Sequence, residues 1–490
     1  MAGKKRPADP SIPESNLKAL NPDGPHVYHR YHIETDPAPD VAPYPSRFQV
    51  RVGKVGLARH LLREIVHYRF NRRLVTSRPC MYGVFSGPIG GFAPRPKMCV
   101  GCLRCMTENP DFVRVYHNPQ RQLLGDSYFT PQLVDAVMYE AQTGKIPVKG
   151  AGYRGKFGGI GWDGMWTDMS EIVRPTRDGI HGREFISTVV HVGERPSYLT
   201  FNDQGMPAGP IPRGFSLPLP ILFDLPPVSL LQDSLVRILV ESARELETLV
   251  ILPLSQMQRL GVQGQHIVPL VTPEDHGSLA IPGEGPLMVE LDSWNEELFK
   301  GVLRQFPAAI PCLRLNFGSG FEEQLLGCVD AGIRVFHLVA NYHGRSTDGD
   351  FVLDTIRRAH QILVDARRRD HVTLIGGGGI IAAEHVPKAI ICGLDLVSLE
   401  TPLLIALQLA MAHGCADRST SQFIVPDLAL GWGTQRLKNL LASWRDQLLE
   451  VMGAMGLREV RRLRGELGRA MFQKDLEREA FEGIAGYEKG

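Results

Sequence analysis

Three cysteines in one short loop are the residues of this chain most clearly suited to chemistry. Cys99, Cys102 and Cys105 follow the spacing C-x-x-C-x-x-C within the stretch MCVGCLRCMTENP. That spacing lets three thiolates converge on one iron–sulfur core. A structural zinc loop and three unrelated free thiols are the alternatives, but zinc sites more often combine two separated C-x-x-C pairs. The spacing therefore favours an iron–sulfur cluster.

The fourth ligand of such a cluster is not part of this run. The usual bacterial motif continues C-x-x-x-C-P, whereas here Asn109 precedes Pro110, and an amide is a poor iron ligand. Either the cluster is of the 3Fe-4S type, or a fourth thiolate completes a 4Fe-4S cluster. Cys80 lies a short Gly- and Pro-rich loop upstream and is the candidate for that ligand. The alternative for Cys80 is a small buried hydrophobic residue.

A run of four glycines, residues 376–379, is the second feature with chemical meaning. Glycine has no Cβ, so backbone amides there can approach a phosphate, and a following helix can add its N-terminal dipole. The alternative is a tight turn that needs small residues. The stretch SLET, residues 398–401, supplies further amides after the next apolar run. We therefore expect a phosphate site that includes Gly377, Gly378, Gly379, Glu400 and Thr401.

The ligand that carries the phosphate could be a sugar phosphate or flavin mononucleotide (FMN). The cysteine motif favours FMN, because a cluster needs a redox partner. Lysine usage agrees with this choice. Between residues 205 and 415 the lysines are Lys300 and Lys388, both on predicted helices, whereas a Schiff-base aldolase needs a lysine at a strand end.

Polar residues near the ends of apolar runs are candidates for substrate and flavin contacts. Arg314, if it points inward, could stabilise negative charge on a reduced flavin ring. His343, in ANYHGRST, could serve as a catalytic acid or base. The alternative for each is a group that orients a loop. The other strand-end candidates are Asp224, Glu274, Asp275, His276, Glu290, Asp292, Asn316 and Asn341.

The elements that must position these residues are regular from about residue 217 onward. Short apolar runs alternate with amphipathic helical stretches, as in proteins built of parallel strands and crossover helices. Eight such runs imply an α/β fold with a closed (β/α)8 TIM-type barrel, whose phosphate sites follow strands seven and eight. An open doubly wound sheet is the alternative. The runs are 220–225, 249–254, 266–271, 287–292, 312–317, 334–340, 372–377 and 394–399.

The rest of the chain divides into segments around this barrel. Residues 54–73 predict a basic amphipathic helix, either packed on its own domain or lying against a membrane surface or a partner. The Gly- and aromatic-rich stretch after residue 143 predicts irregular structure. The expected segments are an extended arm (1–46), an iron–sulfur domain (47–130), a connector contacting the barrel (131–214), the FMN-binding barrel (215–415) and bracing C-terminal helices (416–490).

Composition places the protein in a broad class. The chain has 490 residues, of which 43% are hydrophobic and 22% charged, with a net charge of +1, as in ordinary globular proteins. A balanced charge gives no argument for nucleic acid binding. Eight cysteines, three of them in one loop, do not form a disulfide framework, so we expect a reducing, cytoplasmic compartment. The sequence shows neither a signal peptide nor a membrane-spanning helix.

The glycine run lies in a stretch that resembles a known family. Residues 369–407, RDHVTLIGGGGIIAAEHVPKAIICGLDLVSLETPLLIAL, resemble the phosphate-binding end of the FMN barrel of the glutamate synthase family. GLREVRRLRG resembles that family's C-terminal segment, and the likeness extends over about 215–465. CVGCLRCMTENP resembles the ferredoxin-type segment of the shorter, stand-alone members. The resemblance implies an FMN- and iron–sulfur-dependent oxidoreductase with Gly378, Gly379 and Thr401 at the phosphate.

The chain also departs from the family pattern. The glycine-rich loop after strand six is replaced by VANYHGRST, and Arg314 stands where lysine is usual. The family's three-cysteine motif should follow strand eight, where only Cys415 occurs, and no cysteine begins the chain as in a glutaminase domain. Glutaminase activity is therefore not predicted.

The first hypothesis is an oxidoreductase that acts on a small organic substrate and exchanges electrons with an external donor or acceptor protein, alone, as a homo-oligomer or in a larger complex. The second is a degenerate barrel that serves as a scaffold or electron-transfer subunit. The third is a phosphate-binding barrel with a structural metal and no redox role.

Overall fold

The computed structural model describes most of the chain. The described residues are 31–42, 45–71, 80–86, 89–146, 159–167, 186–194, 201–206, 208, 213–224, 232–277, 279, 285–411, 423–424 and 428–487.

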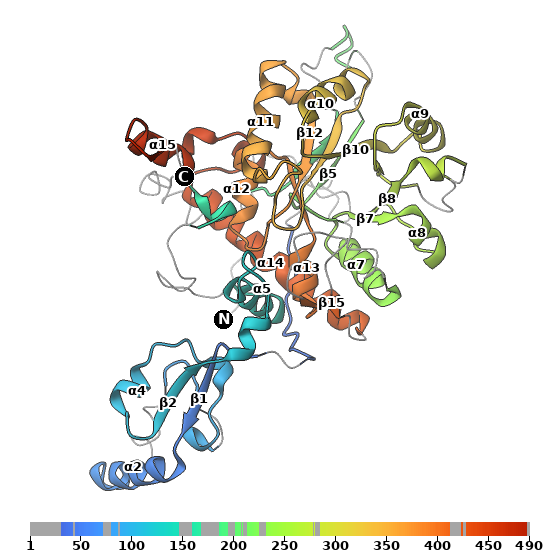
Figure 1. The fold of residues 1–490 in the computed structure, drawn as a ribbon. Helices are drawn as coiled ribbons and strands as arrows, with labels where there is room; N and C mark the ends of the chain where they lie inside the picture. Colours follow the sequence, from blue (N-terminus) through green and yellow to red (C-terminus); the bar gives the residue numbers. More distant parts are fainter. Residues whose placement is uncertain are drawn as a thin grey trace, which may run out of the picture.

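Eight parallel strands close into a barrel at the centre of the molecule (Figure 1). Each strand overlaps one of the eight predicted runs, and the last pairs with the first through Val397 and Ile221. The predicted (β/α)8 barrel is therefore confirmed, and the open sheet is excluded. The strands are β6 (Ile221–Phe223), β7 (Val250–Pro253), β8 (Ile267–Val271), β9 (Met288–Leu291), β10 (Ile310–Asn316), β11 (Val335–Val339), β12 (Thr373–Gly376) and β13 (Leu396–Leu399).

Helices follow the strands and cover the outside of the barrel with their apolar faces. Helix α7, for example, buries Leu235, Val236 and Leu239 and leaves its charged side toward solvent. The short gap after β7 holds a helix of seven residues, α8. The helices are α7 (Asp233–Glu245), α8 (Leu254–Leu260), α9 (Glu296–Gln305), α10 (Phe321–Asp330), α11 (Val352–Asp365), α12 (His385–Cys392) and α13 (Thr401–Ala406).

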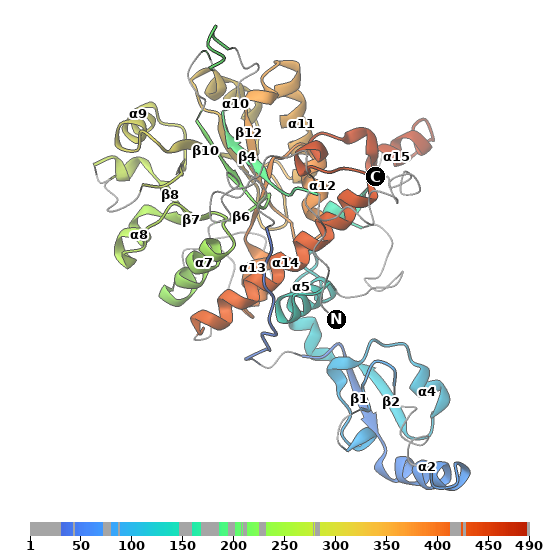
Figure 2. The ribbon, with the colours of Figure 1, turned by 180° about the vertical axis from the view of Figure 1, so that it is seen from behind.

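Two further helices pack side by side against the flank of the barrel, α5 (Pro131–Thr143) and the long α14 (Leu430–Ala454) (Figure 2). Their contact includes buried polar pairs. The indole Nε1 of Trp444 donates to Glu140 Oε2 at 2.8 Å, and Asn439 Nδ2 donates to the carbonyl of Ala141 at 2.9 Å. Because buried polar groups need partners, these bonds determine how the two helices align.

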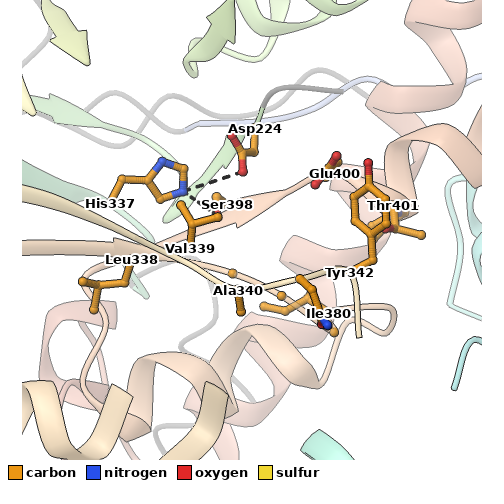
Figure 3. Close-up of a pocket in the computed structure, with 15 residues that line it drawn as sticks. Asp224, His337, Leu338, Val339, Ala340, Tyr342, Ile380, Ser398, Glu400 and Thr401 are labelled. Carbon is orange, nitrogen blue, oxygen red and sulfur yellow. Dashed lines mark hydrogen bonds and ion pairs between the residues drawn. The ribbon is translucent and has the colours of Figure 1, made fainter. Parts of the chain in front are cut away.

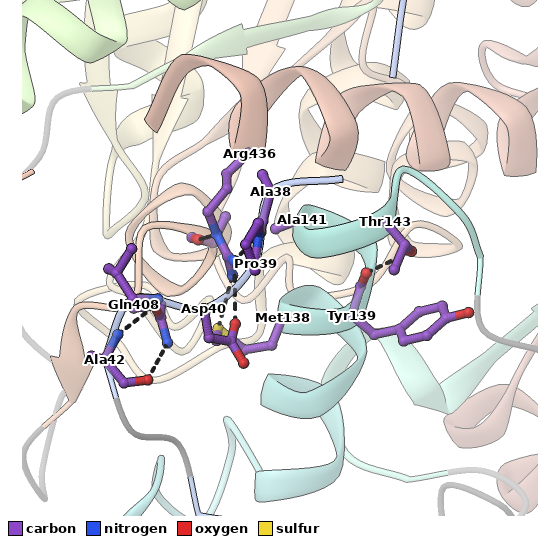
Figure 4. Close-up of polar contacts among 12 residues, drawn as sticks. Ala38, Pro39, Asp40, Ala42, Met138, Tyr139, Ala141, Thr143, Gln408 and Arg436 are labelled. Atoms are coloured by element: carbon purple, nitrogen blue, oxygen red, sulfur yellow. Dashed lines mark hydrogen bonds and ion pairs between the residues drawn. The ribbon is translucent and has the colours of Figure 1, made fainter. Parts of the chain in front are cut away.

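The arm, residues 31–42, runs extended along α14 and is held by side chains of the barrel body (Figure 4). The buried guanidinium of Arg436 donates to the carbonyl of Ala38 at 2.8 Å and pairs with Asp40 at 3.2 Å. Gln408 accepts from the amides of Val41 and Ala42. An irregular segment without sheet partners is thus held in place by side-chain hydrogen bonds.

The cysteine motif lies in a small module that projects from the barrel body (Figure 1). Strands β1 (Phe48–Val52) and β2 (Val113–His117) form an antiparallel pair, with helices α2 (Lys54–His67) and α4 (Arg104–Glu108). The predicted helix 54–73 ends earlier, at His67, because Arg69 and Phe70 take left-handed conformations, with φ of 48° and 62°. Its apolar side is only partly covered: Leu57 is buried and Leu62 is exposed.

Three short antiparallel pairs and one helix are the remaining strands and α-helix of the described residues. They are β3 (Met165–Thr167) with β16 (Ala470–Phe472), β4 (Val190–Gly193) with β5 (Gly214–Leu217), β14 (Ala410–Met411) with β15 (Phe423–Ile424), and α15 (Gln473–Phe481). Within the described ranges, no helix combines the length and apolarity that crossing a membrane requires. Cys415 lies outside the described residues.

Candidate functional site

A pocket lies at the C-terminal ends of the barrel strands (Figure 3). This is the face on which barrel enzymes carry their active sites. The loops after β11, β12 and β13 form most of its wall, and Asp224, directly after β6, forms part of the remainder. The structure thus brings Gly377, Gly378, Gly379, Glu400 and Thr401 to one pocket, whereas their role in phosphate binding stays a prediction.

Steric and backbone constraints explain the glycine run. A Cβ on Gly377 would lie 2.4 Å from the carbonyl oxygen of Ser398. Gly378 and Gly379 have φ of +112° and +65°, conformations that side chains disfavour. The run therefore lets β12 and β13 approach closely where the pocket begins. This steric requirement was the alternative to phosphate binding, and the two explanations are compatible.

Aromatic residues from outside the barrel hold the glycine loop. Tyr128 Oη donates to the carbonyl of Gly379 at 2.7 Å, and Trp162 Nε1 donates to that of Gly378 at 3.0 Å. The amide of Gly379 donates to the carbonyl of Tyr342 at 2.9 Å. In this conformation the Gly379 amide is therefore engaged within the protein, and a phosphate would rely on other amides of the loop.

His343 contacts the segment that leads out of the cysteine module. Its Nε2 lies 2.6 Å from Asp126 Oδ2, and its ring stacks on Tyr128 with the ring centroids 5.3 Å apart. The other carboxylate oxygen of Asp126 accepts from the amides of Tyr128 and Phe129. Burial would raise the pKa of Asp126, but these donors outweigh burial and hold the pKa below its usual range.

The position of His343 bears on its predicted role. It is not among the residues that line the pocket in the described part of the chain. The structure shows it as a residue that docks the turn 126–129 onto the barrel mouth, while its acid–base role stays a prediction.

Arg314 points into the barrel, between two carboxylates. Its Nε donates to Glu290 at 2.5 Å, and its Nη2 donates to Asp224 at 2.7 Å. Burial opposes its charge, but the two carboxylates raise the pKa of Arg314 above its ordinary value. Burial likewise works against ionised Glu290, but Arg314 and His337 keep the pKa of Glu290 low. Arg314 thus reaches the pocket only through neighbours that line it, Asp224 and His337, and its flavin contact stays a prediction.

His337 is a residue that sequence reasoning missed. It lies in the middle of the apolar run RVFHLVA, where a lone histidine gives little signal. In the structure it is fully buried from solvent beside Arg314 in the strand register, and it borders the pocket together with Ser398 (Figure 3). Only the alignment of β10 with β11 could have indicated that these polar residues meet.

The cysteine loop combines tight packing with unusual backbone conformations. Gly101 has a φ of +75°, and a Cβ there would lie 2.3 Å from the Phe48 ring. Leu103, between two of the cysteines, is also left-handed, with a φ of 58°. Both residues therefore bend the loop sharply within the motif.

The thiols of this loop and of Cys80 lie close enough to influence one another. Burial raises the pKa of Cys99, and the neighbouring thiols of Cys80 and Cys102 add to this effect. The pKa of Cys105 is raised in the same way, by burial and then by the other three thiols. Still, in the described residues no group of three or more His, Cys, Asp or Glu has the arrangement of a metal site. The four thiols are chemically suited to iron, and the cluster stays a prediction.

The fold and the pocket define a (β/α)8 barrel with a glycine-rich loop after its seventh strand. Residues 340–458, which include this loop and the pocket wall formed by β13, match the family model described as the conserved region in glutamate synthase. An archaeal-type glutamate synthase (NADPH) from Dehalococcoides mccartyi is 23% identical over 438 residues, which cover 76% of this chain and 86% of the relative. The chain is thus related to the glutamate synthases, as the sequence resemblance predicted.

Other relatives match a shorter part. The archaeal glutamate synthase (NADPH) of Archaeoglobus fulgidus is 28% identical over 116 residues, which cover 21% of this chain and 22% of the relative. Solved structures with a similar barrel include a mandelate oxidase variant with 2-hydroxy-phenylacetamide, at 15% identity and a TM-score of 0.35, covering 61% of this chain and 97% of that one. A flavocytochrome b2 variant with benzoylformate has 12% identity and a TM-score of 0.37, and the match covers 65% of this chain and 86% of that chain.

Proposed function

We propose that this protein is an FMN-dependent oxidoreductase that acts on a small organic substrate at the mouth of the barrel. One observation carries the proposal: the pocket is lined by the glycine loop and by Thr401, and both belong to the region that matches glutamate synthases. When bound, FMN would supply hydride transfer. The protein would supply binding, orientation and proton transfer.

The charges around the pocket limit how a phosphate could be held. Asp224 and Glu400 line the pocket, and no lysine or arginine of the described chain does. A phosphate there would depend on the backbone amides of the glycine loop and on the hydroxyl of Thr401, a buried residue that begins α13. This hydroxyl is therefore the side-chain group whose removal should weaken FMN binding.

A pair of threonine variants tests FMN binding. Thr401→Val keeps the shape of the side chain but removes the hydroxyl, so we expect at least tenfold weaker FMN binding, measured by fluorescence titration of FMN-free protein. The matched control is Thr355→Val, since Thr355 is also buried but bonds within α11, outside the pocket. A wild-type protein that does not bind FMN would contradict the proposal.

We also propose an iron–sulfur cluster on Cys99, Cys102 and Cys105, with Cys80 as fourth ligand, that exchanges electrons with an external protein. The mutual effect of these thiols on their pKa values supports their grouping. Cys80→Ser should convert a four-iron cluster into a three-iron cluster, read from iron content and electron paramagnetic resonance. Cys328→Ser, on α10, is the control. An unchanged four-iron cluster in Cys80→Ser would remove Cys80 from the ligand set, and zinc in place of iron would support a structural metal.

A second candidate is a degenerate barrel that serves as a scaffold or an electron-transfer subunit of a larger complex. The engaged amide of Gly379 and the acidic pocket wall favour it. Bleaching of bound flavin by an organic substrate would support the enzyme, whereas flavin that responds only to protein electron donors would support the second candidate.

A further inference from the structure

We propose that Glu290, His337 and Ser398 form a proton relay at the floor of the pocket, which takes up or returns the proton of a substrate hydroxyl or amine. The inference rests on the proposed function and deepens it. It names the side chains that accept the substrate's hydroxyl or amine proton when the carbon bearing that group loses a hydride. It narrows the substrate class to compounds with an X–H group on the reacting carbon, where X is oxygen or nitrogen.

The three side chains form one continuous chain of hydrogen bonds. His337 Nε2 lies 2.9 Å from Ser398 Oγ, and its Nδ1 lies 3.0 Å from Glu290 Oε1. His337 and Ser398 line the pocket (Figure 3), whereas Glu290 is completely buried and does not line it. A carboxylate at Nδ1 orients the ring and leaves Nε2 to exchange a proton with the hydroxyl.

Charged groups from neighbouring strands surround His337. The charged groups facing it are Glu290 from β9, Arg314 from β10 and Asp224 after β6. Arg314 pairs with both carboxylates, so a neutral imidazole leaves one negative charge in excess. The imidazolium formed when His337 accepts the substrate proton would offset this excess charge, since its Nδ1 lies 3.0 Å from Glu290 Oε1 and its Nε2 lies 3.8 Å from Asp224 Oδ2.

A purely structural role explains this cluster poorly. Barrel interiors are ordinarily filled with branched aliphatic side chains, and a buried ionic cluster is no more stable than apolar packing of the same volume. In addition, Glu290 Oε2 is buried without a hydrogen-bond partner within the described residues. Since buried acceptors are nearly always satisfied, this oxygen marks a place for a water or a further donor beside the relay.

The proposed step balances in atoms and electrons. The C–H bond would break, and its electron pair would leave as a hydride, for which the FMN of the proposed function, when bound, would be the acceptor. The X–H proton passes to Ser398 Oγ as that hydroxyl gives its own proton to His337 Nε2, and a C=X double bond forms. Glu290 stabilises the resulting imidazolium and acts as a positioning residue. The reverse sequence returns the proton when the substrate is reduced.

The test uses FMN-free full-length protein, so that it does not depend on catalysis. Nitrogen-15 nuclear magnetic resonance would follow the histidine rings against pH, with the His337 signals assigned by their loss in His337→Gln. We expect the tautomer with a proton on Nδ1 and a bare Nε2 at high pH, and a ring that takes up a second proton on acidification. The opposite tautomer, or a ring that never becomes doubly protonated in the folded protein, would overturn the relay.

Two variants separate the contacts. Glu290→Gln should make proton uptake by the His337 ring at least tenfold weaker, whereas Ser398→Ala should change mainly the Nε2 signal; His371, outside the barrel, is the internal reference. An unchanged titration in Glu290→Gln would contradict the relay. Because the tautomer is read in wild-type protein, an unfolded Glu290→Gln or Ser398→Ala variant does not remove the test.

Two further outcomes distinguish this inference from its alternatives. Covalent labelling of Ser398 by a fluorophosphonate would identify a nucleophile and overturn the relay. If wild-type protein fails to bind FMN but the His337 ring shows the expected titration, the proposed function is rejected and the proton relay is retained.

Discussion

At the scale of single residues, the pocket depends on close backbone packing and on a few polar groups brought together from distant strands. Gly377 lies against Ser398, and Ser398 in turn contacts His337. A change at the glycine loop therefore acts on both the phosphate site and the proposed relay. Because of this packing, a larger residue at Gly377 would also displace Ser398 in the pocket wall.

Gly377→Ala tests this packing. The new Cβ would lie 2.4 Å from a backbone oxygen, which cannot move without shifting β13, so we expect a loss of about 1–3 kcal/mol in the free energy of unfolding. Chemical denaturation measures it. The matched control is Gly327→Ala, on helix α10, where a Cβ meets no atom within 4 Å. That change should be neutral or stabilise by about 0.5–1 kcal/mol. Equal effects of the two variants would contradict the packing argument.

At the scale of elements, the turn 126–129 joins the cysteine module to the barrel mouth. It contacts two mouth loops, through Asp126 to His343 and through Tyr128 to Gly379. The same side of the module is held to α5 by Arg121, which forms a bidentate ion pair with Asp135 and donates to the carbonyl of Pro131. The cysteine module is therefore anchored at loops of the barrel mouth, and these contacts provide a structural link between the module and the barrel.

Acid should weaken this anchor through Asp126. Because its pKa is lowered in the folded protein, Asp126 contributes stability above the unfolded value of about 3.9, and that contribution is lost as pH falls through the folded pKa. Asp126→Asn should therefore lower the melting temperature at pH 6–7, with a cost of about 1–2 kcal/mol. The difference from wild type should shrink below about pH 4. Melting curves across pH test this, and a difference that grows on acidification would contradict it.

At the scale of the whole molecule, a large barrel carries a small module with few buried apolar side chains. Val50, Leu57, Val84 and Val113 are its buried aliphatic residues between 45 and 117 in the described chain. Modules of this size commonly need a metal or a disulfide for stability. The proposed cluster would thus stabilise the module as well as carry electrons.

Iron removal should affect the two parts differently. We expect scanning calorimetry of cluster-containing protein to show that loss of iron lowers a transition of the module by at least 10 °C. The barrel transition should move by less than about 2 °C, because the barrel has its own extensive core. Cys99→Ser in the presence of iron should reproduce the iron-free curve. A single transition that shifts as a whole would show that the two parts unfold together.

The sequence determined the barrel and the motifs. Parallel strands buried on both faces must be continuously apolar, so eight such runs could be counted in the sequence. The glycine run and the cysteine motif are recognised from residue type and spacing. It did not indicate the early end of α2, because the left-handed conformations of Arg69 and Phe70 carry no distinctive sequence signal.

Only the tertiary structure decided which polar residues meet. Glu290, His337 and Ser398 come from three strands that are far apart in the chain, and their side chains meet inside the barrel. His343 contacts Asp126 and does not line the pocket. Local sequence patterns report which side chains avoid water. The partners of a buried charge depend on barrel closure and strand register, which arise from contacts between distant segments.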